Sequence, residues 1–127
     1  MAYQEEAFTL RATANFVTDE NTRDFDCGNF DSFYLVVVTG TRAGTITLTP
    51  TLQMKLPDGT YLTLQAAAAA IAAAGTVVYY FGIFAGGANF TGIAEPHPGP
   101  IPRTCRFFLD SGGTGNWDVT CYVVPTS

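Results

Sequence analysis

The amino-acid sequence predicts an all-β protein, an antiparallel β-sandwich of jelly-roll type with about eight strands. Residues 45–64 alternate apolar and polar side chains, which is typical of strands with one buried face. The composition is rich in threonine, glycine and aromatic residues and poor in charge, and turn-forming residues recur at short intervals. A chain of 127 residues is long enough for one domain with its own core.

The first 32 residues are predicted to stand apart from the β-sandwich core, which extends over residues 33–127 of the same domain. Residues 1–15 are expected to form an edge strand or an arm, with Phe8 and Leu10 as their apolar points. Ordering a backbone costs roughly 1–2 kcal/mol per residue, so a segment with little apolar surface orders mainly where a partner supplies contacts. We therefore predict that Phe8 and Leu10 contact a partner protein or a neighbouring copy.

An acidic and irregular segment follows, from Asp19 to Asp31. Carboxylate oxygens at this density are able to hold a hard cation. However, Asp24 and Asp26 lack the glycine and the distal glutamate that a calcium-binding loop places at fixed offsets. The sequence therefore predicts a solvated loop and no metal site.

Two strands are predicted to carry apolar residues on both faces, residues 33–39 (FYLVVVT) and residues 76–85 (TVVYYFGIFA). A strand of an antiparallel sheet normally needs only one apolar face, because the other face meets water. We expect the second face to be covered, either by a neighbouring subunit or by long loops of the same chain.

Residues 45–64 are predicted to form a β-hairpin around Pro57-Asp58-Gly59, in which proline and glycine supply the backbone angles of the turn. A three-residue loop places apolar side chains opposite apolar ones and polar opposite polar. The expected pairs are Met54–Leu62, Leu52–Leu64, Lys55–Tyr61 and Gln53–Thr63. Pro50 cannot donate a hydrogen bond within a sheet, so an edge position or a bulge is expected there.

The alanine-rich stretch from Gln65 to Gly75 is expected to be an extended or irregular connection, with a short helix as the alternative. Residues 86–102 are rich in glycine and proline and predict an exposed loop. Two closing strands, residues 103–109 and 117–124, are expected to pair across the glycine-rich link DSGGTGN.

Charge and cysteine content narrow the range of partners and compartments. The net charge is −5 and the six lysines and arginines are scattered, so neither nucleic acid nor a membrane is an expected partner. The first residues carry two glutamates where a signal peptide has a basic patch and an apolar run. Three cysteines are an odd number, and Cys105 and Cys121 share faces with apolar residues, so we expect three free thiols in a reducing compartment.

No catalytic constellation is apparent, and neither enzyme activity nor a cofactor is predicted. His97, the single histidine, lies between two prolines without the signature of a Ser-His-Asp or Cys-His arrangement. No cysteines have the spacing of zinc ligands. Tyr79, Tyr80 and Trp117 are able to form a sugar-stacking platform, although aromatic residues on strands usually belong to a core.

Several features in a fixed order carry a resemblance to a known family. They are the strand FYLVVVT, the strand TITLTPTLQ, Asp58-Gly59-Thr60-Tyr61, an alanine-rich link ending in Gly75-Thr76, a tyrosine-bearing strand, the segment IPRTCR and a closing glycine-rich hairpin. In this order the chain from Phe33 to Val124 resembles the small head decoration proteins of tailed bacteriophages, also called cement or auxiliary capsid proteins. It departs from them at Cys105, where similar sequences often carry tryptophan, and in the longer, glycine-rich FGIFAGGANF.

The resemblance implies a β-sandwich that binds the major capsid protein on the outside of the phage shell, commonly as a homotrimer, and reinforces the shell. It also implies a location on the virion exterior after assembly in the cytoplasm of the bacterial host. The N-terminal segment with Phe8 and Leu10 is then expected to contact the shell or a neighbour. Two alternatives remain, a neck, tail or fibre-associated virion module and a carbohydrate-binding sandwich.

Overall fold

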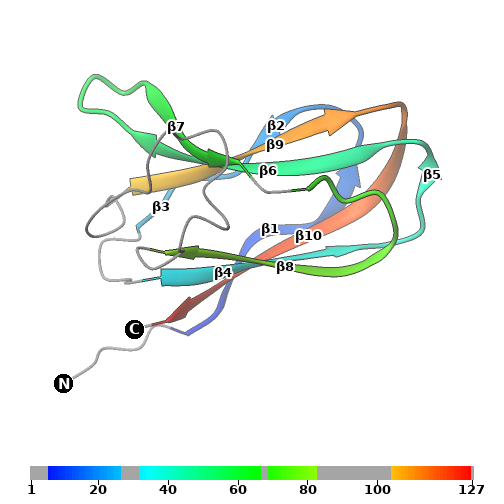
Figure 1. The fold of residues 1–127 in the computed structure, drawn as a ribbon, viewed down its shortest axis with the longest axis horizontal. Coiled ribbons are helices and arrows are strands. Elements are labelled where there is room, and N and C mark those ends of the chain that lie inside the picture. Colours follow the sequence, from blue (N-terminus) through cyan, green and yellow to red (C-terminus); the bar gives the residue numbers. More distant parts are fainter. Residues whose placement is uncertain (1–5, 27–31, 67–68, 83–103, 127) are drawn as a thin grey trace.

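Two antiparallel β-sheets face each other in the computed structural model, which describes residues 6–26, 32–66, 69–82 and 104–126 (Figure 1). The strands of this part are β1 (Phe8–Phe16), β2 (Glu20–Asn21), β3 (Phe25–Asp26), β4 (Ser32–Thr39), β5 (Ala43–Gly44), β6 (Thr47–Lys55), β7 (Tyr61–Ala66), β8 (Gly75–Gly82), β9 (Thr104–Gly112) and β10 (Gly115–Thr126). The predicted all-β sandwich is confirmed. Among the described residues, no helix has the length and hydropathy to cross a membrane.

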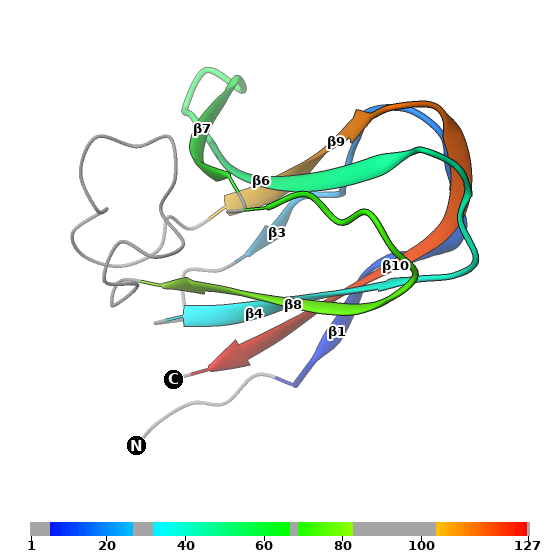
Figure 2. The same ribbon diagram turned by 45° about the vertical axis from the view of Figure 1, so that its right-hand side comes forward.

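The strand order is that of a jelly roll. One sheet has the order β1-β10-β4-β8 and the other β2-β9-β6-β7, with β5 also paired to β10 and β3 to β9. The chain therefore behaves as one long antiparallel ribbon rolled upon itself, with β1 against β10, β2 and β3 against β9, β4 against β8, and β6 against β7. The β6–β7 hairpin is the tip of that ribbon, and the chain crosses between the sheets from β9 to β10 (Figure 2).

The hairpin turns through the predicted three-residue loop. The Leu56 amide donates to the Thr60 carbonyl at 2.7 Å, and Gly59 takes a φ of 88°. Three of the four predicted pairs are confirmed, namely Met54–Leu62, Lys55–Tyr61 and Gln53–Thr63. The fourth is wrong, because a register shift places Leu52 opposite Gln65 instead of Leu64. The extra residue in β7 lets both leucines remain buried in the core.

Pro50 does not lie in an edge strand, because β6 is flanked by β9 and β7. At Pro50, however, β6 has no paired residue on the side that faces β7. The Leu48 amide and carbonyl both bond to Ile71, at 3.1 and 2.8 Å, and alternation along the strand turns Pro50 to the same side. On that side β7 pairs with β6 only from Thr51 onward, so the missing N–H of proline removes no ladder hydrogen bond between β6 and β7.

The alanine-rich connection is irregular where the structure describes it, from Ala69 to Ala74, as the sequence predicted. Ile71 is its one large side chain, and it lies buried in the core. The Leu48–Ile71 bridge holds this connection against β6. Residues 67–68 and the predicted glycine- and proline-rich loop of residues 86–102 lie outside the described residues.

The two closing strands do not form a hairpin, which corrects the expectation from the sequence. β9 belongs to the second sheet and β10 to the first, so the chain changes sheets at residues 113–114. Gly113 has a φ of 64° and Gly115 a φ of 130°. A side chain at these positions would collide with the carbonyl oxygens of Thr45 and Ala43 respectively. Glycine is needed here because two backbone segments pass in close contact at the corner.

β1 is an integral edge strand and not an arm. It pairs with β10 from Phe8 to Phe16, and Leu10 is only 4% exposed within the core. The prediction that Leu10 contacts a partner is therefore wrong for the folded chain. Phe8 is half-buried and lies against the core, with its ring centroid 6.1 Å from that of Phe25.

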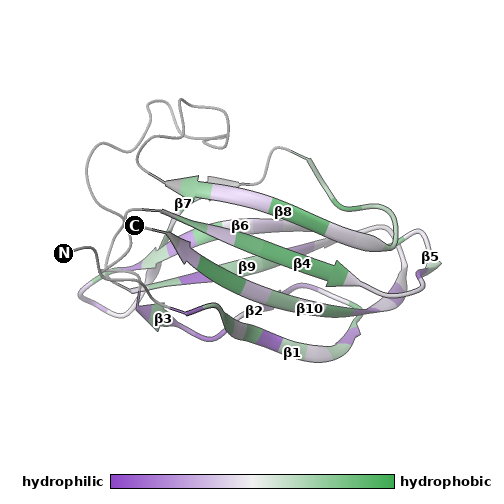
Figure 3. Cartoon of the chain, turned by 90° about the horizontal axis from the view of Figure 1, so that it is seen from below, coloured by the Kyte–Doolittle hydropathy of each residue, from purple (hydrophilic) through white to green (hydrophobic). Residues whose placement is uncertain are grey.

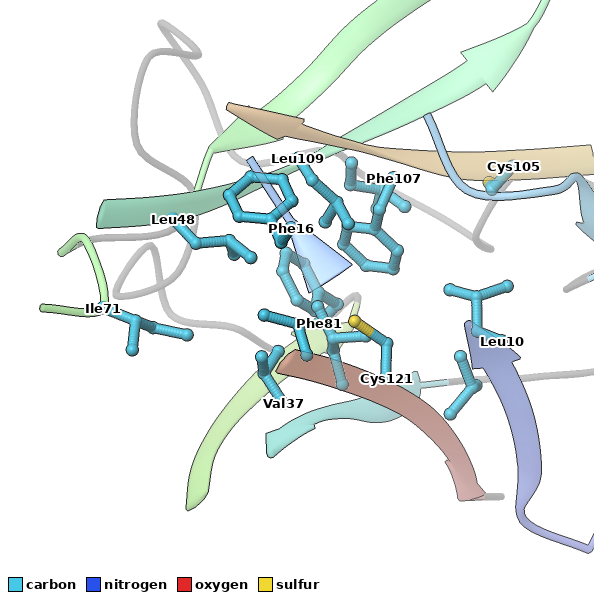
Figure 4. Packing of buried hydrophobic residues seen from close by; sticks show 14 of the residues in the cluster. Leu10, Phe16, Val37, Leu48, Ile71, Phe81, Cys105, Phe107, Leu109 and Cys121 are labelled. Carbon is cyan, nitrogen blue, oxygen red and sulfur yellow. The ribbon is translucent and has the colours of Figure 1, made fainter. Parts of the chain in front are cut away.

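A cluster of phenylalanine rings lies between the sheets, and Figure 4 shows two of its members, Phe81 and Phe107. Phe33 and Phe81 of the first sheet have ring centroids 5.5 Å apart, and Phe81 meets Phe107 of the second sheet at 5.1 Å. Phe25 stacks on Phe107 at 6.0 Å. Because these rings come from four strands and both sheets, their packing fixes how the sheets lie against each other.

Cys105 on β9 and Cys121 on β10 are buried, and neither forms a disulfide. Burial raises the pKa of the Cys121 thiol to about 12. Both side chains are fully buried, so neither cysteine is expected to react with a thiol reagent such as DTNB in the native protein, and both are expected to react in denaturant. Counting modified Cys105 and Cys121 by peptide mass spectrometry checks this. Rapid labelling without denaturant would show that the core opens locally. Cys27 lies outside the described residues.

Candidate functional site

The outer face of the sheet β1-β10-β4-β8 gathers exposed apolar side chains. We call this group of residues the tyrosine–valine face, and it consists of Tyr34, Val36 and Val38 on β4, Val78 and Tyr80 on β8, and Tyr122 and Val124 on β10. Figure 3 looks onto this sheet and shows apolar residues along much of β4 and β10 and on part of β8. Val78 is 55% exposed, and Tyr34 and Tyr122 are each 38% exposed.

Strand alternation determines which side chains reach this face. On β4, Phe33, Leu35 and Val37 are fully buried, so the residues between them point away from the core. On β10, Val119, Cys121 and Val123 are buried in the same way. The inner positions alone complete the core, and the outer apolar residues are surplus to it.

Register brings the outer residues of three strands into rows. Tyr122 lies opposite Val36, and Val36 lies opposite Val78, so one row crosses β10, β4 and β8. The next row contains Val124, Tyr34 and Tyr80. The rings of Tyr34 and Tyr80 lie 5.3 Å apart at 55°. Cross-strand packing of this kind gives a continuous apolar surface instead of isolated exposed residues.

The outer face of the other sheet has a different character. Its outward positions on β6 are mainly threonine, at Thr47, Thr49 and Thr51, followed by Gln53. Polar groups there bond to one another, as in the contact of 2.9 Å between Arg106 Nε and Gln53 Oε1. Such a face is suited to water, whereas none of the seven residues of the tyrosine–valine face is charged, and Asp118 lies beyond them on β10.

A polar cluster ties the segment before β3 to the hairpin. The Tyr61 hydroxyl contacts both carboxylate oxygens of Asp24, at 2.7 and 2.8 Å, which raises the pKa of that tyrosine. The Arg106 guanidinium lies 3.4 Å from the centroid of the Tyr61 ring, and Lys55 Nζ lies 3.7 Å from Asp24. These contacts are made within the protein, so the cluster holds the segment before β3 against the hairpin.

The acidic segment uses its carboxylates within the fold. Asp19 accepts hydrogen bonds from the amide and hydroxyl of Ser111, at 2.7 and 2.8 Å, and these bonds lower the pKa of Asp19. Glu20 pairs with Arg11 and so joins β2 to β1. Within the described ranges, no three acidic, histidine or cysteine residues come together in a possible metal site. Asp31 lies outside those ranges.

The residues proposed for sugar stacking are not brought together. Trp117 is 1% exposed in the core, and Tyr79 turns inward, where its hydroxyl meets the Ala69 carbonyl at 3.0 Å. Tyr80 alone belongs to the tyrosine–valine face. Tyr122 was not predicted as a surface residue of this kind, although its alternation with the buried Cys121 and Val123 contains the necessary signal. His97 lies outside the described residues.

An apolar pocket of about 360 Å³ lies between β8 and the alanine-rich connection. It is lined by Ala69–Thr76, Val77 and Tyr79. The one side-chain hydroxyl of Tyr79 is bonded to the Ala69 carbonyl, and none of the lining residues carries a charge. Apart from the Thr76 hydroxyl, the lining therefore offers no side-chain group that is free to fix a polar ligand.

No protein-family model matches the chain, and no curated protein matches it. The functional interpretation accordingly depends on the chemistry of the two outer faces and on the resemblance carried by the strand motifs.

Proposed function

We propose that the protein is a structural virion protein that binds the major capsid protein on the outer surface of a phage capsid and stabilises the shell. The observation that carries this proposal is the tyrosine–valine face, an uncharged apolar surface on one side of a sandwich whose other side is rich in threonine. Docking on a partner removes an apolar surface of this kind from water, which lowers the free energy. This stabilisation needs area and shape complementarity but no reactive group.

The resemblance to head decoration proteins supports the same function and adds the expectation of a homotrimer. A virion component also binds in many copies at once, so contacts of modest strength at each copy are sufficient for retention. The same surface chemistry suits a neck, tail or fibre-associated module. Density on the outer shell in images of purified virions separates these locations, because a neck or tail component leaves the shell bare.

Substitution on the tyrosine–valine face tests which surface binds. The double variant Tyr34→Asp, Tyr122→Asp is expected to keep its fold, because both side chains are partly exposed, and to lose at least about tenfold in retention on purified capsids. Thr63→Asp places a charge on the exposed side of the other sheet and is the matched control. Co-sedimentation of each protein with capsids measures retention. Equal retention of all three proteins would rule out this face as the binding surface.

Carbohydrate binding is the second candidate, favoured by the placement of Tyr34, Tyr80 and Tyr122 on one exposed sheet face. Aromatic rings on a flat surface are able to stack on sugar rings. Screening the protein on a glycan array tests this candidate. Glycan binding that disappears in the Tyr34→Asp, Tyr122→Asp variant, together with unchanged capsid density, would favour the lectin-like function over the structural one.

A further inference from the structure

The exposed edges of the two sheets differ in how they are protected from pairing with another chain. β1 carries Arg11 and two register shifts against β10. β7 has a register shift against β6, and β2 and β3 are only two residues long and contain Glu20 and Asp26. Charges, bulges and short length are the usual means by which a protein blocks the free hydrogen-bonding groups of an edge strand.

β8 has none of these protections. Its eight residues, GTVVYYFG, contain no charge and no proline, and its pairing with β4 runs from Gly75 to Gly82 without a register shift. No strand among the described residues pairs with its other edge. Thr76 and Val78 are exposed, and Val77, Tyr79 and Tyr80 are only partly buried. A long, uncharged edge rich in β-branched and aromatic residues is the kind that adds a further strand.

We propose that β8 pairs antiparallel with β8 of a second copy of this chain, with Val78 opposite its own symmetry mate. A strand edge that has no partner strand among the described residues is completed by another extended strand, and not by a helix or a compact loop. A second copy is the occupant because the strand is complementary to itself. It is also uncharged, so two chains of net charge −5 are able to meet there without opposing carboxylates.

The register follows from the side chains. In a continuous antiparallel sheet, residues that lie opposite each other point to the same face. When the two strands are identical, this requires that one residue of β8 lies opposite the same residue of the second copy, next to the twofold axis. When that residue is Val78, Thr76 lies opposite Tyr80 and Val77 lies opposite Tyr79. Both pairs join a β-branched residue to an aromatic one, a favourable combination across strands. The pairing leaves Val78 near the middle of the eight-residue strand and pairs residues 75–81 with one another.

The pairing makes a twofold dimer and places two tyrosine–valine faces side by side on one continuous sheet. It therefore differs from the trimer that the resemblance implies, and it does not depend on capsid binding. The assembly is tested on the isolated protein, and capsid retention is a separate measurement, so either proposal can fail without the other.

Light scattering on the purified protein at about 50 µM tests the mass, with twice 13.6 kDa expected. Val78→Lys is expected to raise the dissociation constant at least about tenfold, because two like charges then lie directly opposite each other at the edge. Tyr122→Lys lies on the same face but two strands away and is expected to leave the dimer intact. A wild-type mass of one or three chains would overturn the proposal, as would a Val78→Lys protein that dimerises as strongly as the wild type.

A cysteine at the twofold axis tests the register. In a Cys27→Ser background, Val78→Cys is expected to form a disulfide-linked dimer under mild oxidation, because residues directly opposite in an antiparallel pair have Cα atoms about 4.5–5.5 Å apart, within the range of a disulfide. Tyr122→Cys is expected to remain monomeric on a non-reducing gel. Cross-linking through Tyr122→Cys but not through Val78→Cys would overturn the proposal in favour of face-to-face association.

Discussion

A chain that lacks residues 2–14 is expected to lose its cooperative thermal transition. The truncation removes most of β1, including its pairing with β10, and it removes Leu10 from the core. Loss of one buried leucine side chain costs about 2–5 kcal/mol, and small domains have only about 5–15 kcal/mol of total stability. Removal of the ion pair between Arg11 and Glu20 opens the same side of the sandwich. Circular dichroism during heating measures the transition.

Point substitutions in β1 test its contribution to stability without shortening the chain. Leu10→Ala is expected to lower the free energy of unfolding by about 2–5 kcal/mol, and Thr9→Ala, at an exposed position beside it, by less than about 0.5 kcal/mol. If the truncated chain melts within a few degrees of the full-length protein, β1 is dispensable. The N-terminal segment would then again be a candidate for an arm that orders on a partner.

Gly115→Ala is expected to destabilise the protein by about 3 kcal/mol or more, the scale at which a backbone clash adds to a strained conformation. Gly115 has a φ of 130°, which residues with a side chain rarely adopt, and its Cβ would collide with the Ala43 carbonyl oxygen. Because the obstacle is backbone, no side-chain rotation relieves it. Chemical denaturation with urea measures the change in unfolding free energy.

Gly59→Ala is the matched control, since Gly59 also has a positive φ, of 88°, but a Cβ there would meet no atom within 4 Å. This variant is expected to lose only about 1–2 kcal/mol, the cost of the left-handed conformation itself. Equal losses at Gly59 and Gly115 would mean that the corner relaxes and that close approach of β5 is not essential to the fold.

The sandwich keeps its two faces chemically distinct, and this separation links the fold to the proposed function. A row of threonines on β6 faces water, while the row from Tyr122 through Val36 to Val78 stays apolar at the surface. The apolar row runs toward the unprotected edge at β8. Pairing through that edge would therefore enlarge the apolar face without covering it, so that two copies present one binding surface to a shell.

Local patterns in the sequence determined the strands, the turn at Pro57-Asp58-Gly59 and the inward position of residues such as Phe107 and Val119. Each of these depends on neighbours within a few residues, because side-chain alternation and turn angles are local properties of the backbone. The excess of apolar residues in FYLVVVT also indicated a second apolar face, although its members on β10 were not recognised.

Only the tertiary structure decided which strands share a sheet. β9 and β10 have the sequence of a hairpin, yet close contacts at Gly113 and Gly115 turn the chain from one sheet to the other. β1 has few apolar residues, yet Leu10, Phe16 and the backbone bonds to β10 place it in the fold. Pairing between distant strands depends on how whole faces pack together, and no window of a few residues contains that information. For the same reason, only the assembled sheets show that one edge of β8 has no partner strand among the described residues.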